Sequence, residues 1–167
     1  PDRQQAILSA AEKLFARNGY HAVTIRQIAE EAGVPLALVA YYYGPKNDLF
    51  HAVFAHWGHT IEERLAALEA VMQDPQDPQT LTRIVEAFIY PVIHMRSSDE
   101  GQYYAQLVGR ELAYNSEEAD RVLRDFFDPM AHRFIDALHA ARPHSARSTA
   151  AWAYQFALGA LLHHISD

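Results

Sequence analysis

Apolar residues recur every three or four positions along almost the whole of this 167-residue chain. That spacing places them on one face of an α-helix, because a helical turn has about 3.6 residues. A sustained alternation of apolar and polar residues, which a half-buried β-strand would need, does not occur in the sequence. The pattern therefore predicts an all-α fold.

Short helices are expected in the first part of the chain. The first ends at Asn18–Gly19, where the glycine would supply a left-handed C-cap. The second begins at Thr24, and Gln27 stands three residues later, as in a capping box. Gly33 breaks that helix, and a short apolar helix follows from Pro35 to about Tyr42.

The remainder of the chain predicts longer helices that would form a bundle. Pro45 opens a helix with a continuous apolar stripe, Pro91 should bend the next helix, and Pro129 should interrupt a later one. The expected ranges are about 45–72, 78–95, 98–114, 115–141 and 146–165. We therefore divide the chain into an N-terminal domain, residues 1–46, and a C-terminal helical bundle, residues 47–167.

Composition limits the classes of protein that fit this pattern. Half of the residues are apolar, which is enough to bury a core. The sequence has no cysteine, so a disulfide framework, a thiolate metal site and a cysteine nucleophile are excluded. It also has no long uncharged apolar run and no secretory signal pattern, so we expect a soluble, cytoplasmic protein that does not interact with a membrane.

The net charge of -7 is unfavourable for binding nucleic acid, because phosphate contacts need Lys and Arg. The charge is unevenly distributed, however. Through Phe50 the cations Arg3, Lys13, Arg17, Arg26 and Lys46 balance the anions Asp2, Glu12, Glu30, Glu31 and Asp48. The acidic excess therefore lies downstream of Phe50, and the part of the chain before it is neutral.

The second and third short helices have the pattern of a helix-turn-helix. This motif needs a small residue where two helices cross, a glycine at the turn, and apolar residues that hold the second helix against the first. Ile28, Ala29, Gly33, Val34 and Val39 supply that set. The same pattern would also fit an ordinary helical hairpin that turns at Gly33.

Three sequence boxes in this region resemble the N-terminal signature of the TetR family of transcriptional regulators. They are Thr24–Ala29, Ala32–Val34 and Tyr41–Leu49, in the order and spacing of the family. The resemblance covers roughly the first 54 residues. It implies a helix-turn-helix domain that binds a double-stranded DNA operator, followed by a helical domain for dimerisation and effector binding.

Carried over by position, the resemblance implies that Thr24, Tyr41 and Lys46 contact backbone phosphates. Lys46 also stands at an expected helix N-terminus, where free N–H groups and a partial positive charge favour an anion. A solvated surface lysine is the alternative. Arg26 would reach a phosphate or a groove edge, or would instead pair with Glu30 one turn later.

The expected recognition segment, Pro35–Ala40, departs from many relatives because it offers few polar groups to base edges. Reading of the DNA sequence would then rest on thymine methyl groups, tyrosine hydroxyls and DNA shape. The residues expected to make these contacts are Leu36, Ala37 and Ala40 for the methyl groups, and Tyr41 and Tyr42 for the hydroxyls.

Ten histidines raise the question of a metal or acid–base site. None has the H-E-x-x-H or E-x-x-H spacing of helical metal sites. We therefore expect no catalytic residue, no metal site and no cofactor, and we do not expect an enzyme.

Aromatic and polar side chains on the central helices permit a cavity, because pockets between bundle helices are largely apolar with a few polar anchors. The resemblance implies that a small, mostly apolar effector binds there. A plain hydrophobic core is the alternative. The candidate residues are Trp57, Phe88, Tyr90, His94, Tyr103, Tyr104 and Arg110.

The last two helices carry more apolar surface than one side of a helix needs. We expect them to form the four-helix interface of a two-fold homodimer, with closure of the subunit's own core as the alternative. The residues assigned to the interface are Phe127, Phe134, Tyr154, Ala157, Leu158 and Leu161.

These features together predict a ligand-responsive transcriptional regulator, a repressor that binds a palindromic operator as a dimer. The alternative is a helical-bundle carrier of small molecules, or an enzyme, in which the N-terminal domain serves only as structure.

Overall fold

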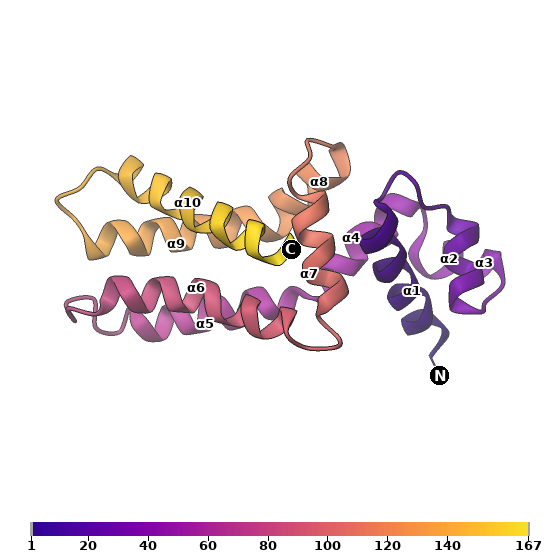
Figure 1. Cartoon of the computed structure of the whole chain (residues 1–167), viewed down its shortest axis with the longest axis horizontal. Coiled ribbons are helices and arrows are strands. Elements are labelled where there is room, and N and C mark those ends of the chain that lie inside the picture. The colour runs from indigo at the N-terminus through magenta and orange to yellow at the C-terminus, as the bar shows by residue number, and fades with distance from the viewer. Residues whose placement is uncertain (1, 167) are drawn as a thin grey trace.

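The computed structural model describes residues 2–166, and over that range the regular structure is entirely helical (Figure 1). A small N-terminal unit lies at one end of an elongated body made of two pairs of long helices. The predicted all-α fold, with an N-terminal helix-turn-helix and a C-terminal helical domain, is confirmed.

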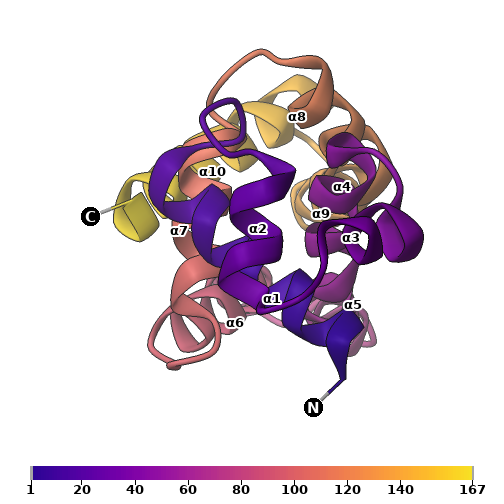
Figure 2. The same ribbon diagram turned by 90° about the vertical axis from the view of Figure 1, so that its right-hand side faces the viewer.

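The N-terminal unit consists of α1 (Arg3–Asn18), α2 (Ile25–Ala32) and α3 (Leu36–Tyr43), seen end-on in Figure 2. Helix α1 packs against both α2 and α3. The side chains at the centre of this unit are almost completely buried and apolar: Ile7, Ala11, Phe15, Val23, Ile28 and Val39. Burial of these side chains holds the three helices together.

Local signals set the ends of α2 as the sequence predicts. The Thr24 hydroxyl accepts a hydrogen bond from the Gln27 backbone at 3.2 Å, and the Gln27 side chain accepts one from the Thr24 backbone at 2.8 Å. Gly33 closes the helix with φ 66° and ψ 35°, the left-handed region. Gly19 ends α1 differently, because its φ is 83° but its ψ is 155°, so the expected left-handed cap is wrong in detail there.

The single helix expected over residues 45–72 is wrong, because the chain breaks at Trp57 into α4 (Lys46–His56) and α5 (Gly58–Val71). Trp57 has φ -91° and ψ 7°, outside the α-helical region. Its indole Nε1 donates a hydrogen bond to Glu12 of α1 at 2.9 Å. The Trp57 carbonyl accepts hydrogen bonds from both the hydroxyl and the backbone N–H of Thr60, at 2.7 and 3.0 Å.

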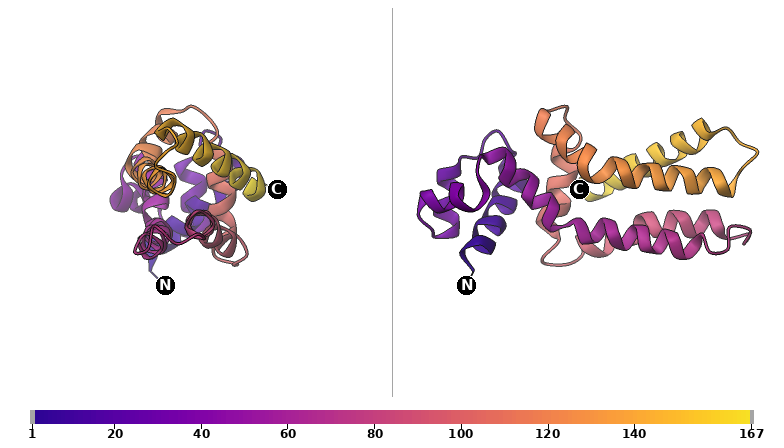
Figure 3. Two further views of the ribbon diagram at one scale, coloured as in Figure 1. Left: turned by 90° about the vertical axis from the view of Figure 1, so that its left-hand side faces the viewer. Right: turned by 180° about the vertical axis from the view of Figure 1, so that it is seen from behind.

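The body contains α5, α6 (Thr80–Arg96), α7 (Gln102–Glu111), α8 (Glu117–Val122), α9 (Asp128–Ala141) and α10 (Arg147–Ser166). Helices α5 and α6 form one antiparallel pair, and α9 and α10 form another (Figure 3). Helix α7 packs against α1, α6 and α10, so it joins the N-terminal unit to the body. Within residues 2–166, no helix is long and apolar enough to cross a membrane.

The predicted interruption near Pro129 takes the form of a π-helical turn, Leu123–Phe127, between α8 and α9. The Asp128 backbone N–H reaches the Leu123 carbonyl, one residue further back than in an α-helix. Pro129 follows in the first turn of α9 and has no N–H to donate. By contrast, α6 runs through Pro91 as one helix.

Three direct contacts fasten α1 and its C-terminal turn to α7. The Tyr20 backbone N–H donates to the Glu111 carboxylate at 3.0 Å. The Arg110 guanidinium donates to the Arg17 carbonyl at 2.9 Å, and the Arg17 guanidinium donates to the Tyr103 hydroxyl at 2.9 Å. Helix α7 and the C-terminal end of α1 are therefore directly connected.

Candidate nucleic-acid interface and body cavity

The outer face of α3 is exposed and apolar. It lies at the end of the molecule furthest from the body (Figure 1). Val39 is fully buried and anchors the helix, whereas Leu36 is 47% and Tyr41 79% exposed. Ala37, Ala40 and Tyr42 are exposed as well. All five residues predicted to face bases are therefore accessible, on a short helix suited in size to the major groove.

Thr24 and Arg26 are both exposed at the start of α2. The Thr24 hydroxyl accepts from the Gln27 backbone and donates to the Gln27 side chain, both at 3.2 Å, so its one hydrogen-bond donor is used within the capping box. Within the described residues, the guanidinium of Arg26 forms neither a hydrogen bond nor an ion pair, so the alternative pairing with Glu30 does not occur in this structure. Arg26 is free to contact a phosphate.

Lys46 is held by the protein itself. Its ammonium group donates to the Val23 carbonyl at 2.8 Å and lies 4.3 Å from the centre of the Tyr20 ring. Partial burial lowers the pKa of Lys46, while Glu118 and Glu111 act in the opposite direction. Two ammonium donors are left, so a phosphate contact would add to a structural role that the sequence did not reveal.

Few other cations of the N-terminal unit are available. Lys13 forms an ion pair with Glu31 between α1 and α2. Arg17 is directed toward Tyr103 of the body. Phosphate binding by one subunit would thus depend on Arg3 and Arg26, together with Lys46 and backbone groups at helix N-termini.

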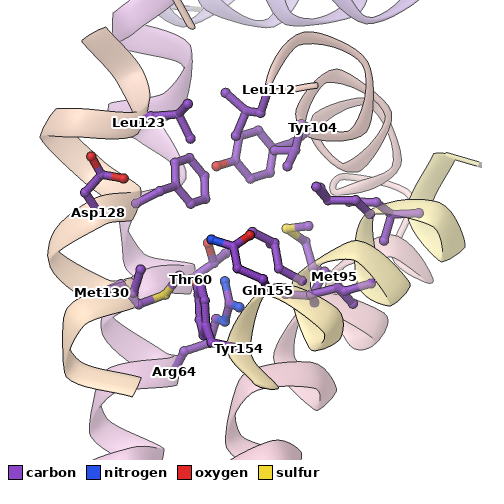
Figure 4. A pocket seen from close by; sticks show the side chains of 18 residues that line it. Thr60, Arg64, Met95, Tyr104, Leu112, Leu123, Asp128, Met130, Tyr154 and Gln155 are labelled. Carbon is purple, nitrogen blue, oxygen red and sulfur yellow. The ribbon is translucent and has the colours of Figure 1, made fainter. Parts of the chain in front are cut away.

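A cavity of about 310 Å³ lies in the body (Figure 4). Residues of α5, α6, α7, α9, α10 and the π-helical turn surround it. Most of the lining is apolar and includes Val92, Met95, Val108, Leu112, Leu123, Phe127, Met130, Leu158, Leu161 and Ile165. Polar groups come from Thr60, Arg64, Tyr104, Asp128, Tyr154 and Gln155.

Arg64 is the most unusual lining residue, because its side chain is charged and almost completely buried at 5% exposure. Its guanidinium lies 4.3 Å from the centre of the Phe88 ring. Two of its nitrogens, Nε and Nη2, are buried and have no hydrogen-bond partner. Removal from water lowers the pKa of Arg64 from 12.5 to about 10, and the guanidinium stays charged at neutral pH.

Two tyrosines of the cavity remain protonated. Burial raises the pKa of Tyr104 well above its usual range and also raises the pKa of Tyr154, although Arg64 opposes both shifts. Their hydroxyls can therefore donate hydrogen bonds at any ordinary pH. Figure 4 shows the Tyr104 hydroxyl at the end of the cavity opposite Arg64.

Of the seven residues proposed for the effector pocket, only Tyr104 lines this cavity. Tyr90 is 61% exposed and His94 is also exposed, because both lie on the outer face of α6. The other four are engaged elsewhere: Trp57 with Glu12, Phe88 beneath Arg64, Tyr103 with Arg17, and Arg110 with the Arg17 carbonyl. That assignment of the pocket lining is therefore corrected.

Sequence reasoning missed Arg64 and Thr60 as site residues. Ile61, Arg64 and Leu68 are spaced by three and four residues, and all three are buried. A cation on the buried stripe of a helix was the available signal, because charged side chains are rarely buried without a partner. Within residues 2–166, no group of three His, Asp or Glu side chains is placed to hold a metal ion.

The cavity is connected to α1 through aromatic contacts. Tyr104 stacks on Trp57 with ring centres 5.0 Å apart and planes inclined by 10°. The Trp57 indole donates to Glu12, a buried residue of α1. Burial raises the pKa of Glu12, and the hydrogen bond from Trp57 lowers it in part. These contacts form a continuous connection from the cavity lining to α1.

The residues predicted to form a dimer interface face mostly inward. Phe134, Tyr154 and Leu161 are 1%, 4% and 6% exposed and belong to the subunit's own core. Phe127, Ala157 and Leu158 are half-buried. The assignment of Phe134, Tyr154 and Leu161 to an interface is therefore corrected, whereas Phe127, Ala157 and Leu158 keep part of their surface accessible.

The opposite side of α10 is exposed and apolar. Trp152 and Phe156 are 65% and 73% exposed, with ring centres 6.1 Å apart. Gly159 and Ala160 continue this side by one turn and are exposed as well. We call these four residues the α10 face. Large exposed aromatic groups beside small residues are typical of protein contact surfaces.

Family models match both parts of the chain. Residues 7–53 match the model described as bacterial regulatory proteins, tetR family, and residues 86–167 match the model described as tetracyclin repressor-like, C-terminal domain. The chain therefore belongs to the TetR family of regulators, as the sequence boxes predict.

Curated relatives agree with this assignment. The HTH-type transcriptional regulator HbdR of Aromatoleum sp. (strain CIB) is 34% identical over 91 residues, which cover 54% of this chain and 36% of that protein. The HTH-type transcriptional regulator BetI of Brucella canis is 29% identical over 129 residues, covering 69% of this chain and 64% of that protein. The chain thus spans about one third to two thirds of the length of these relatives.

Solved structures show the same fold. The hemolysin II transcriptional regulator HlyIIR superposes with a TM-score of 0.67 at 22% identity, covering 98% of this chain and 94% of that one. The TetR-family regulator PfmR of Thermus thermophilus has a TM-score of 0.64 at 19% identity, with 95% and 84% covered. A complex of SmeT with triclosan has a TM-score of 0.69 at 19% identity, with 97% and 79% covered.

Proposed function

We propose that this protein is a transcriptional repressor that binds a palindromic DNA operator as a homodimer and releases it when a small molecule occupies the body cavity. The observation that carries the proposal is the exposed outer face of α3 on a rigid three-helix unit, which α7 connects to the cavity. The cytoplasm, where bacterial DNA lies, is the corresponding compartment.

Two DNA-binding units are needed because one subunit offers few free cations and a short, apolar recognition helix. A two-fold axis provides two units at a fixed spacing, which suits two half-sites on the same side of the duplex. The α10 face is the surface that supports dimerisation. It would pack against its own copy, since a two-fold interface brings the same patch of both subunits together.

Release would follow from a change in the spacing of the two units. A ligand in the cavity contacts Tyr104, which stacks on Trp57, and Trp57 is hydrogen-bonded to α1 through Glu12. If the ligand binds best to a conformation in which α1 is displaced, both units can no longer dock at once. The structurally similar protein SmeT has been solved in complex with triclosan. This supports the proposal that a protein of this fold binds a small molecule.

The test begins with selection of genomic DNA fragments by the protein, followed by fluorescence anisotropy with the selected duplex. The affinity should fall steeply as salt rises, because each phosphate contact releases a bound counterion. A Tyr41→Ala variant should bind the duplex more weakly at every salt concentration. If no fragment is selected, or if affinity is independent of salt and of Tyr41, the protein is not a DNA-binding regulator.

A carrier or enzyme built on the same bundle is the second candidate function. The cavity with its polar groups favours a carrier or an enzyme as much as it favours an effector site. The two functions differ in the effect of the ligand on DNA. A regulator loses DNA affinity when the ligand binds, whereas a carrier binds the ligand with no DNA-dependent change.

A further inference from the structure

The buried guanidinium of Arg64 lacks the partner that such a group normally has. Charged side chains that leave water are almost always paired, because desolvation of an unpaired charge costs several kcal/mol. Within residues 2–166 no carboxylate lies within ion-pair distance of Arg64, although Asp128 lines the same cavity. The guanidinium contacts the ring of Phe88 and interacts electrostatically with the Tyr154 and Tyr104 hydroxyls, which burial keeps protonated. A partner from outside the chain would complete the site.

The unpaired nitrogens define the shape of that partner. Nε and Nη2 lie on one edge of the planar guanidinium, and their N–H bonds point in the same direction. Two parallel donors match the two oxygens of a carboxylate, which accepts both hydrogen bonds at once. An alcohol or a ketone offers one oxygen and leaves one donor unsatisfied.

The remainder of the cavity defines the body of the ligand. Leucine, valine and methionine side chains make up half of the lining. A volume of about 310 Å³ is at the lower end of the range for small-molecule sites, so the ligand is small. The protonated hydroxyls of Tyr104 and Tyr154 can donate further hydrogen bonds to an oxygen of the ligand.

We propose that the cavity binds a carboxylic acid with a compact apolar body, and that Arg64 receives the carboxylate through Nε and Nη2. Binding of the acid does not depend on the proposed function. Only the statement that this acid is the effector rests on it. Because both nitrogens are covered in the unliganded protein, a neighbouring side chain moves when the acid binds. Tyr154 and Gln155 of α10 lie beside Arg64 in the view of Figure 4.

Isothermal titration calorimetry on the full chain, without DNA, tests this assignment. The probes are matched sets in which only the head group differs: octanoate, 1-octanol and octylamine, and phenylacetate, 2-phenylethanol and phenethylamine. At least one acid should bind about tenfold or more tightly than both of its partners, since a charge-assisted pair adds at least about 1.4 kcal/mol. The amines test whether Asp128 instead selects a cation.

Arg64→Met provides the decisive variant, because methionine has a similar length and no charge. It should lose the preference for the acid, with acid affinity falling about tenfold or more and alcohol affinity changing less than about threefold. Arg83→Met is the matched control, since Arg83 is an exposed cation of α6 paired with Asp77, away from the cavity lining. It should keep the wild-type preference. Circular dichroism melting shows that each variant is folded.

The proposal is overturned if no acid binds, if in both matched sets an alcohol or an amine binds as tightly as its acid, or if Arg64→Met keeps the preference. The proposed function fails separately. If the acids bind through Arg64 but the protein selects no DNA, the ligand assignment is supported and the proposed function as a DNA-binding regulator is wrong. If DNA is selected and a neutral or cationic compound releases it, the regulator stands and the ligand assignment does not.

Discussion

Arg64 combines a full charge with almost complete burial, and this has a measurable effect on stability. The lowering of its pKa from 12.5 to about 10 corresponds to roughly 3 kcal/mol of unfavourable desolvation at neutral pH, where both the folded and unfolded chains hold the proton. Arg64→Met should therefore stabilise the unliganded protein by about 1–3 kcal/mol. Its melting temperature should rise by roughly 3–8 °C, measured by calorimetry.

The comparison is again Arg83→Met, at a position 48% exposed and paired with Asp77. Removal of an exposed pair changes stability by about 0–1 kcal/mol, so its melting temperature should stay near that of the wild type. A lower melting temperature for Arg64→Met would show that the guanidinium contributes to the fold rather than awaiting a ligand.

Tyr41 and Lys46 were both expected to touch phosphates, but their environments separate them. Tyr41 is 79% exposed, so Tyr41→Ala should leave stability within about 0.5 kcal/mol and weaken operator binding about five- to tenfold.

Lys46→Ala also removes the hydrogen bond to Val23 and the contact with Tyr20, so it should destabilise the protein by about 1 kcal/mol. Chemical denaturation and DNA anisotropy measure the two effects.

For Lys46, a loss of stability with normal DNA affinity would assign it a purely structural role. Arg26→Ala is a useful companion, because Arg26 has no partner to lose within the described residues. Its effect should appear in DNA affinity alone.

At the scale of helices, the junction of α1, α4 and α7 depends on the hydrogen bond between Trp57 and Glu12. Trp57→Phe keeps the ring that stacks on Tyr104 but leaves the buried carboxylate without that donor. It should destabilise the protein by about 1–3 kcal/mol at neutral pH. In the double variant with Glu12→Leu, which removes both polar groups, part of this loss should be recovered.

The same junction has a defined dependence on pH. Burial raises the pKa of Glu12, so the folded protein holds this proton more tightly than the unfolded chain does. Burial of the ionised Glu12 carboxylate therefore lowers the free energy of unfolding at neutral pH. This destabilisation shrinks as the pH falls through the raised pKa of the folded protein toward the pKa of the unfolded chain. Trp57→Phe should enlarge the effect, since the donor that lowers this pKa is lost. Thermal melts between neutral and mildly acidic pH test this. A difference in melting temperature between the variant and the wild type that does not change with pH would contradict it.

How far the sequence predicts each helix depends on the range of the interactions that set it. The ends of α2 follow from Thr24, Gln27 and Gly33, which act within a few residues, and they were predicted correctly. The break at Trp57 coincides with a hydrogen bond to Glu12, 45 positions away, and the local apolar stripe could not reveal such a contact. The cavity depends on the phase of several helices at once, and a small error in phase moved the expected pocket to Tyr90 and His94 on the surface.

At the scale of the whole molecule, the α10 face makes assembly testable. Phe156→Glu places a charge on a side chain that is 73% exposed, so the subunit should stay folded. If the face packs against its copy, the variant should be monomeric at micromolar concentration by light scattering. Its DNA affinity should fall by far more than tenfold, because a monomer binds through one N-terminal unit and loses the gain from bivalent binding.

A suitable control is Gln76→Glu, which adds the same charge in the exposed turn between α5 and α6. It should leave both mass and DNA affinity unchanged. If Phe156→Glu has the mass of the wild type, the protein either is a monomer or assembles through another surface.

The π-helical turn before α9 has an evolutionary consequence. It holds one residue more than an α-helical turn would, and Leu123 and Phe127, at its two ends, both line the cavity. Deletion of one residue in this segment would restore regular α-helical geometry. It would also rotate α8, which precedes the turn, by about 100° relative to α9. A different pair of side chains would then face the cavity. Lineages that gain or lose this one residue would therefore change which compounds they accept without altering the helices that read DNA.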